Sequence, residues 1–355
     1  MKKKIAIFGA GAIGRGFIAP LFSDEDYEID FIDSNEELVR ELNLKKKYIL
    51  GVTAKKKYIF KTITFNKAYG NREKINIGKY DIVFSCVGPT QCFENVEYYK
   101  KAKILISCEN DKESVPKLKK LTSNKNIFFS IPDVITSNTA PKKLLDRDKL
   151  SIISEQGILV VEKNKFKFPK DIQVVNKKKL DSHWICKMSI HNAPHAIVAY
   201  LGFLKKYKFI HEAMKNKKIN KIVVGAIKEI TKGIISCKLV EKKFANFYMK
   251  KEIRRFSNEL LYDPISRVAR DPLRKLAHDD RLIKSIHIAL FNKTLPKNCA
   301  IGIKAALQYF DKDDEQSKHL KIMVDNFGER YVLRKICGLQ NNEPLVNFCL
   351  NQRLF

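Results

Sequence analysis

Three side chains that can transfer a proton and hold a carbonyl oxygen lie close together near the middle of the chain. Lys187, Asn192 and His195 follow the only tryptophan, Trp184, at the spacing K-x4-N-x2-H. If this segment is helical, Asn192 and His195 lie three positions apart and share a face. Lys187 lies five positions before Asn192, so a turn or a bent helix must bring the two together. The alternative interpretation is a basic helix start with one half-buried histidine.

A glycine-rich loop near the N-terminus supplies the second chemical pattern. Residues 4–8 read as a buried strand, G-x-G-x-x-G follows at residues 9–14, and residues 15–22 are apolar at helical spacing. Strand, glycine loop and helix in this order are typical of a dinucleotide-binding Rossmann unit.

The conformation of this loop and its contact with a ligand explain why glycine is expected at each of three positions. Gly9 allows the tight turn, Gly11 lets the backbone approach a pyrophosphate, and Gly14 lets helix and strand pack closely. Ala12 and Ile13 complete the loop at the predicted helix start, whose N–H groups can bind an anion. We therefore predict that these five residues bind the cofactor.

An acidic residue follows the next predicted strand. Residues 27–32 end in Asp33, nineteen positions beyond Gly14. A carboxylate there accepts hydrogen bonds from the ribose hydroxyls and repels a 2′-phosphate, so we predict NAD rather than NADP.

Further predicted strands each run into a polar or glycine-containing loop. Strands are expected at residues 82–86, 103–107, 127–131, 150–153 and 158–162, with Val87, Gly88, Asn110, Asp133 and Glu155 at or near their ends. Strands alternating with helices predict a mostly parallel, doubly wound sheet, which binds ligands at its carboxyl edge. Val87 and Gly88 are accordingly predicted to contact the cofactor.

Helical periodicity dominates after Trp184, for example over residues 195–204, 218–239 and 296–310. We predict an NAD-binding Rossmann domain over residues 1–183 and an α-helical catalytic and substrate domain over residues 184–355. The fold class is therefore α/β followed by a mostly helical domain.

The net charge, the apolar runs and the cysteines limit which classes of partner the protein can have. The net charge of +29 favours an anionic substrate or a lysine-rich exposed surface, but no aromatic platform or nucleic-acid motif accompanies the lysine runs. We expect no membrane partner, because glycines interrupt the apolar N-terminal run and no other stretch approaches the length of a span. Eight scattered cysteines without zinc spacing indicate reduced thiols, no metal site and a cytoplasmic location.

A basic run at residues 267–276, followed by acidic residues 279 and 280, contains Pro272, which must interrupt any helix. Its guanidinium groups suit capture of a carboxylate or phosphate, or a structural arginine–aspartate network. Both interpretations stay open, with Arg274, Lys275 and Arg281 as phosphate-binding candidates.

Four motifs occur in the order found in one known family. They are I-F-G-A-G-A-I-G-R-G-F-I at residues 7–18, Cys108-Glu109-Asn110, the K-x4-N-x2-H signature, and R-D-P-L-R-K-L at residues 270–276. Over nearly the whole chain they resemble the polyol-specific long-chain dehydrogenases, the mannitol dehydrogenase family. The resemblance implies a Rossmann domain followed by a helical domain, NAD(H) as cofactor and no metal.

The resemblance also implies roles for individual residues. Lys187 would be the general base, Asn110 and Asn192 would hold the reacting oxygen, and His195 would orient substrate hydroxyls. The substrate site would further include Asp133, Arg255 and Asn258, and Glu155 matches a family acid. Pro194 stands where the family often has glycine and Val134 where it has arginine, so both affect the expected substrate pocket.

The implied activity is interconversion of a sugar-alcohol phosphate and a ketose phosphate, with mannitol 1-phosphate and fructose 6-phosphate as the first pair. One alternative is a dehydrogenase of an unphosphorylated polyol or a uronate. A second, from another class, is a catalytically inactive NAD-sensing or nucleic-acid-binding protein. The oligomeric state stays open between monomer and dimer.

Overall fold

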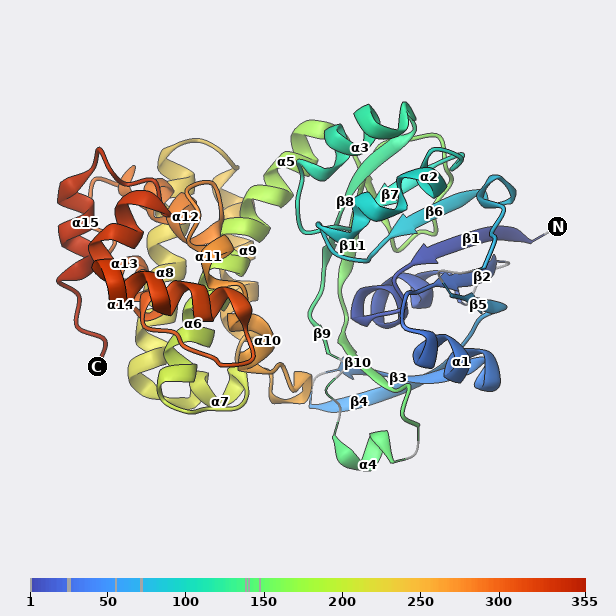
Figure 1. Ribbon diagram of the computed structural model, residues 1–355, viewed down its shortest axis with the longest axis horizontal. Helices are drawn as coiled ribbons and strands as arrows, with labels where there is room; N and C mark the ends of the chain where they lie inside the picture. Colours follow the sequence, from blue (N-terminus) through green and yellow to red (C-terminus); the bar gives the residue numbers. More distant parts are fainter. Residues whose placement is uncertain are drawn as a thin grey trace. The chain divides into compact units, whose positions relative to one another are not determined.

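The computed structural model describes residues 2–23, 27–54, 56–70, 73–137, 139, 141–146 and 148–355. The chain divides into two compact units, Met1–His183 and Trp184–Phe355. The boundary between them falls inside helix α5 (Lys177–Ile185). Figure 1 shows strands in the first unit and helices throughout the second.

An eight-stranded sheet forms the centre of the first unit. Its order is β12-β11-β8-β7-β6-β1-β2-β5. The bounds are β1 (Lys3–Phe8), β2 (Tyr27–Ile32), β5 (Lys67–Tyr69), β6 (Ile82–Ser85), β7 (Leu105–Ser107), β8 (Ile127–Asp133), β11 (Ile158–Glu162) and β12 (Gln173–Val175). The six strands from β8 to β5 run parallel. Because the chain leaves β1 toward β2 on one side and adds β6 on the other, β1 lies at the switch point where open sheets bind ligands.

The predicted Rossmann-type sheet is confirmed, but its far edge differs from the simple parallel expectation. β11 pairs antiparallel with β8, and β12 pairs parallel with β11. The end of β11 therefore lies at the same edge of the sheet as the beginnings of β1, β6, β7 and β8.

A second, four-stranded sheet was not predicted. It consists, in the order β4-β3-β10-β9, of β3 (Lys47–Ala54), β4 (Lys57–Thr64), β10 (Ile152–Glu155) and β9 (Thr136–Ser137). The two strands expected around Glu155 thus belong to different sheets. The β3–β4 hairpin gave little signal, because β4 exposes most of its side chains and lacks a clear buried–exposed alternation.

The helices of the first unit are short. They are α1 (Glu36–Lys45), α2 (Val96–Tyr99), α3 (Ser114–Thr122), α4 (Lys142–Leu145) and the 3₁₀ turns η3 (Ile77–Lys79) and η4 (Gln91–Asn95). The α-helix expected over residues 15–22 is instead a π turn, η1 (Gly14–Ile18), followed by a 3₁₀ turn, η2 (Ala19–Leu21). Pro20 has no N–H group, so a regular α-helical hydrogen bond cannot form at that position.

The second unit is helical wherever it has regular structure. A π turn, η5 (Cys186–Asn192), leads into α6 (Ala193–Leu204), which is buried from Ala193 to Gly202 and packs against α8, α10, α12 and α13. The other helical segments are α7 (Ile210–Lys215), α8 (Lys217–Ser236), α9 (Lys242–Arg255), η6 (Glu259–Leu261), α10 (Ile265–Ala269), α11 (Pro272–Lys275), α12 (Arg281–Leu290), α13 (Lys297–Leu307), α14 (Glu315–Lys335) and α15 (Glu343–Leu350). The three long helices predicted from periodicity correspond to α6, α8 and α13, apart from their end residues.

Pro272 interrupts the basic run as predicted. Asp271 has a left-handed backbone (φ 59°) and separates α10 from α11. No helix in the described ranges is long and apolar enough to cross a membrane.

Candidate active site

The glycine loop follows β1, and two of its glycines are required by packing. Gly9 has φ 91°, and a Cβ there would lie 2.5 Å from the carbonyl oxygen of Cys86. A Cβ on Gly14 would lie 1.9 Å from the carbonyl oxygen of Gly9. Both contacts are shorter than any real Cβ tolerates, so neither position accepts another residue without a backbone shift.

Gly11 is different, because a Cβ there would have no atom within 4 Å. Nothing in the described chain requires a glycine at this position. A ligand whose phosphates must approach the backbone does require one. The loop thus fits a dinucleotide.

Arg15 fixes this loop through backbone carbonyls, a role that was not predicted from the sequence. Its buried guanidinium donates through Nε to the carbonyl of Ala10 and through Nη1 to that of Leu150, at 2.5 and 2.6 Å. Tyr48 donates its hydroxyl to the Arg15 carbonyl at 2.6 Å. Burial lowers the pKa of Arg15. In the sequence, Arg15 is the one charged residue in the apolar run of residues 5–22, which could have indicated a structural role.

Asp33 lies directly beside the loop, as expected for an acid that binds ribose. Its Oδ2 accepts a hydrogen bond from the Ala10 N–H at 2.7 Å, and its Oδ1 accepts one from the Asn35 N–H at 2.9 Å. These contacts fix the carboxylate at the carboxyl end of β2. Each oxygen retains a second lone pair that a ribose hydroxyl can use.

Glu109 organises the neighbouring turn at Val87 and Gly88. The buried carboxyl accepts from the Ser85 hydroxyl at 2.6 Å, from the Val87 N–H at 3.1 Å and from the Gly88 N–H at 2.8 Å. Tyr99 in turn donates to Ser85 at 2.9 Å. Burial raises the pKa of Glu109 to about 7, although all three donors favour the charged form. The sequence showed Glu109 only as part of a motif, without this role.

The other polar residues predicted in the first unit follow or end neighbouring strands. Asn110 follows Glu109 beyond the carboxyl end of β7, and Asp133 is the buried last residue of β8. Glu155 ends β10 and accepts from the Ile135 N–H at 2.7 Å. Asn110 and Asp133 thus lie at the carboxyl edge, where a sheet of this kind binds ligands.

A π turn resolves the spacing problem in the K-x4-N-x2-H signature. In η5 the chain makes i→i+5 hydrogen bonds, for example from the Ala193 N–H to the Met188 carbonyl. Residues five apart lie one above the other in such a turn, so Lys187 and Asn192 share a face despite their separation. Asn192 also donates through Nδ2 to Met188 Sδ at 3.0 Å. Isolated π turns in longer helices are often found at functional sites.

His195 follows on the first turn of α6 and is held by a buried acid. Its Nε2 lies 2.8 Å from Asp263 Oδ2, and Arg267 donates to Asp263 Oδ1 at 2.5 Å. The charges of Arg267 and His195 lower the pKa of Asp263 against the effect of burial. Pro194 does not prevent this contact, since Pro is accommodated in the first turn of α6.

A second buried imidazole, His191, lies beside the first and was not predicted. Its Nδ1 is 2.6 Å from Glu252 Oε2, and Arg255 donates to Glu252 Oε1 at 2.6 Å. Burial lowers the pKa of His191 to about 4, while that of Glu252 is lowered to about 2 by His191 and Arg255 despite its own burial. The neutral imidazole therefore donates to an ionised carboxylate. The signal in the sequence was a histidine four positions before His195.

An aromatic ring joins these two histidines. Phe256 stacks on His195 with ring centroids 5.0 Å apart and lies 5.5 Å from His191. Of the predicted substrate residues, Arg255 is engaged with Glu252, and Asn258 accepts through Oδ1 from the Leu260 N–H at 3.1 Å.

The basic run forms an arginine–aspartate network. Arg274 contacts Asp271 at 3.1 Å and Asp280 at 3.6 Å, and Arg281 contacts Asp280 at 2.7 Å. Lys275 is buried and donates to the Arg270 carbonyl, and its pKa is lowered by burial. The structural network expected as one of the two interpretations is therefore present, and phosphate binding by Arg274, Lys275 or Arg281 stays a prediction. In the described part of the chain, no group of three or more metal-ligating side chains gathers in one place.

Two family models match the chain, one for each unit. The mannitol dehydrogenase Rossmann domain matches residues 3–169, and the mannitol dehydrogenase C-terminal domain matches residues 179–345. Mannitol-1-phosphate 5-dehydrogenase of Buchnera aphidicola subsp. Acyrthosiphon pisum is 32% identical over 368 residues, covering 96% of this chain and 95% of the relative. The enzyme of that name from Clostridium acetobutylicum is 29% identical over 371 residues with the same coverage.

Solved structures show the same fold. Pseudomonas fluorescens mannitol 2-dehydrogenase, solved with NAD and D-mannitol, aligns with a TM-score of 0.75 at 14% identity and covers 99% of this chain and 94% of that one. A D-sorbitol dehydrogenase in substrate-free form aligns with a TM-score of 0.72 at 16% identity, covering 99% and 92%. The chain belongs to the mannitol dehydrogenase family of polyol dehydrogenases.

Proposed function

We propose that this protein is an NAD-dependent dehydrogenase that interconverts a sugar-alcohol phosphate and a ketose phosphate, with mannitol 1-phosphate and fructose 6-phosphate as the first pair to test. The observation that carries the proposal is the π turn, which aligns Lys187 with Asn192 directly before His195. The name of the relatives at about 30% identity supports the phosphorylated substrate.

The first unit is the proposed NAD-binding domain. The open space at Gly11 and the fixed carboxylate of Asp33 support this assignment. NAD held by the glycine loop and Asp33 would supply the acceptor for the hydride of the alcohol carbon. A second negative charge beside Asp33 would be repelled, so NAD is preferred over NADP.

The second unit is the proposed catalytic and substrate domain. Lys187 takes the hydroxyl proton at Nζ, as a general base. Asn192 donates an amide hydrogen bond to the oxygen as negative charge develops on it, and the same role is proposed for Asn110 from the family resemblance. His195 orients a substrate hydroxyl, and its contact with Asp263 fixes the ring for this purpose.

Three further residues are proposed to bind substrate. Asp133 is a buried acceptor at the end of β8. Arg255 and Asn258 bracket Phe256, the ring that stacks on His195. Because Phe256 stacks on His195, residues that flank Phe256 are expected to lie near the substrate that His195 orients.

The decisive experiment is an NADH-oxidation screen over ketoses, ketose phosphates and uronates with purified protein. Fructose 6-phosphate should give the highest kcat/KM. Lys187→Ala should lower kcat by roughly 10²–10⁴-fold with NADH affinity retained, as expected for loss of a general base. Lys178→Ala, which removes an exposed lysine from α5, is the matched control.

Each result of the screen has a defined meaning. No oxidation of NADH with any ketose phosphate or uronate would refute the activity, and full activity of Lys187→Ala would remove this lysine from the mechanism. Preference for an unphosphorylated ketose or a uronate would reassign the substrate. Equal turnover with NADPH would refute the role given to Asp33.

A further inference from the structure

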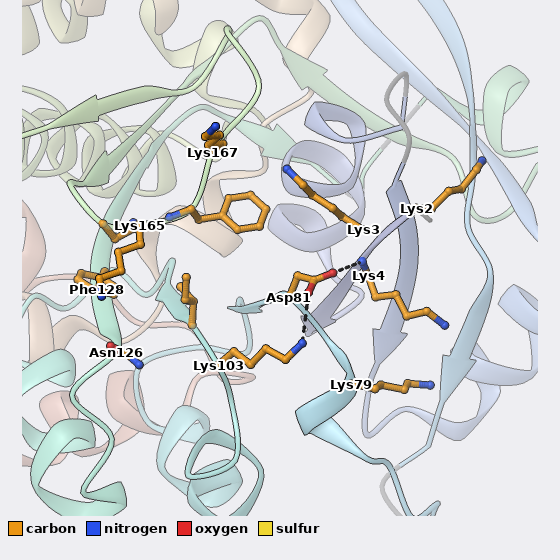
Figure 2. A pocket seen from close by; sticks show the side chains of 13 residues that line it. Lys2, Lys3, Lys4, Lys79, Asp81, Lys103, Asn126, Phe128, Lys165 and Lys167 are labelled. Carbon is orange, nitrogen blue, oxygen red and sulfur yellow. Dashed lines mark hydrogen bonds and ion pairs between the residues drawn. The ribbon is translucent and has the colours of Figure 1, made fainter.

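A basic hollow lies at the edge of the main sheet opposite the glycine loop. It has a volume of about 1000 Å³ and is lined by seven lysines, one aspartate, two asparagines and three apolar side chains. These are Lys2, Lys3, Lys4, Lys79, Asp81, Lys103, Ile104, Asn126, Phe128, Asn164, Lys165, Phe166 and Lys167. We call it the amino-edge groove (Figure 2).

The topology of the sheet gathers these residues from five separate segments. The beginnings of the parallel strands β1, β6, β7 and β8 supply residues 2–4, 79–81, 103–104 and 126–128. Because β11 runs antiparallel to β8, the loop after its end returns to the same edge and adds residues 164–167. Figure 2 shows Lys165 and Asn126 on one side of the hollow and Lys4 and Lys79 on the other.

Acids neutralise part of this surface, because Lys4 pairs with Glu28 at 3.3 Å and Lys79 with Asp30 at 3.8 Å. Asp81 accepts from the Lys4 N–H at 2.9 Å and from Lys103 Nζ at 3.3 Å, so it serves to hold two strand starts together. Within the described ranges, Lys2, Lys165 and Lys167 are exposed and have no acidic partner. In the part of the chain that the structure describes, no carboxylate offsets the positive charge of these three lysines, so a bound anion would gain electrostatic free energy from them.

The aromatic residues of the groove are already covered by cations. Lys3 Nζ lies 5.2 Å from the centre of the Phe166 ring, and Phe168 packs edge-on against that ring at 4.9 Å. Lys119 Nζ lies 5.7 Å from the centre of Phe128. Binding of single-stranded nucleic acid relies on aromatic faces on which bases stack, and these rings are engaged elsewhere.

We propose that the amino-edge groove is a binding site for a compact anion with several closely spaced phosphate groups, such as a short polyphosphate chain. Lysine ammonium groups bind phosphates as point charges, and the groove volume matches a small-molecule site. The site is separate from the proposed cofactor site, because the six residues of β1 separate the two edges by roughly 20 Å.

Calorimetric titration of the full chain with inorganic tripolyphosphate tests this assignment. The triple variant Lys2→Ala/Lys165→Ala/Lys167→Ala should bind at least about tenfold more weakly than the wild type, since three charge-assisted contacts are lost. The control Lys221→Ala/Lys228→Ala/Lys232→Ala removes the same charge from exposed positions of α8 and should bind as the wild type does. Neither variant should change NADH affinity.

Four outcomes would overturn the proposal. They are absence of measurable tripolyphosphate binding, equal weakening in both triple variants, equal affinity for orthophosphate, and displacement of tripolyphosphate by a lower concentration of a single-stranded oligonucleotide. The second would show that total charge rather than the groove binds the probe. The fourth would assign the groove to nucleic acid.

Discussion

Replacing Glu109 with glutamine should remove a specific part of the pH dependence of stability. The carboxyl is buried under the turn at Val87 and Gly88, and burial raises its pKa from 4.5 to about 7. A raised pKa means that the fold prefers the protonated acid. The stability that Glu109 contributes is therefore complete below pH 4.5 and is lost as the pH rises through about 7.

The magnitude follows from the shift. One pKa unit corresponds to 1.36 kcal/mol, so a shift of about 2.5 units makes the folded state about 3 kcal/mol less stable above pH 8 than below pH 4. Between pH 5 and pH 8 most of this change, roughly 2 to 3 kcal/mol, should be visible. Glutamine has the same shape but no charge to titrate.

The assay is urea unfolding followed by circular dichroism at several values between pH 5 and pH 8. Between these limits the wild type should lose roughly 2 to 3 kcal/mol more than Glu109→Gln does. Glu94→Gln, an exposed carboxyl on η4, is the control and should follow the wild type. If Glu109→Gln and the wild type show parallel pH profiles, Glu109 does not titrate in this range and the reasoning is wrong.

Three further outcomes are expected. Gly14→Ala should yield little folded protein in a thermal melt, because its Cβ would lie 1.9 Å from the Gly9 carbonyl oxygen, whereas a wild-type melting temperature would contradict this packing. Gly11→Ala should melt as the wild type does but bind NADH at least about tenfold more weakly in a fluorescence titration, since only a ligand would meet the new methyl group. Glu252→Gln should lose about 3–5 kcal/mol in urea unfolding at pH 7, because it leaves the buried guanidinium of Arg255 without its carboxylate partner. The wild type should lose part of the same stabilisation as the pH falls from 4.5 toward 2, and its absence would show that Glu252 is not ionised in the fold.

Local patterns were sufficient for the parts of the fold that depend on neighbouring residues. The glycine spacing predicted the β1 loop, the buried runs predicted β2, β6 and β8, and helical periodicity predicted α6, α8 and α13. Pairing between distant strands has no comparable local signal. The β3–β4 hairpin and the antiparallel β11 were therefore not predicted from the sequence.

The sequence by itself determined which chemical groups this protein has and their spacing along the chain: the glycine loop with Asp33, and Lys187, Asn192 and His195. These are short-range features, which a linear pattern can express. The tertiary structure decided how the groups are held. It formed the π turn that brings Lys187 and Asn192 to one face, and it buried Glu109 beneath the Val87–Gly88 turn. It also made β11 antiparallel to β8, so that lysines far apart in the sequence line one groove. Burial and long-range pairing depend on the whole fold, because each results from contacts between segments far apart in the sequence.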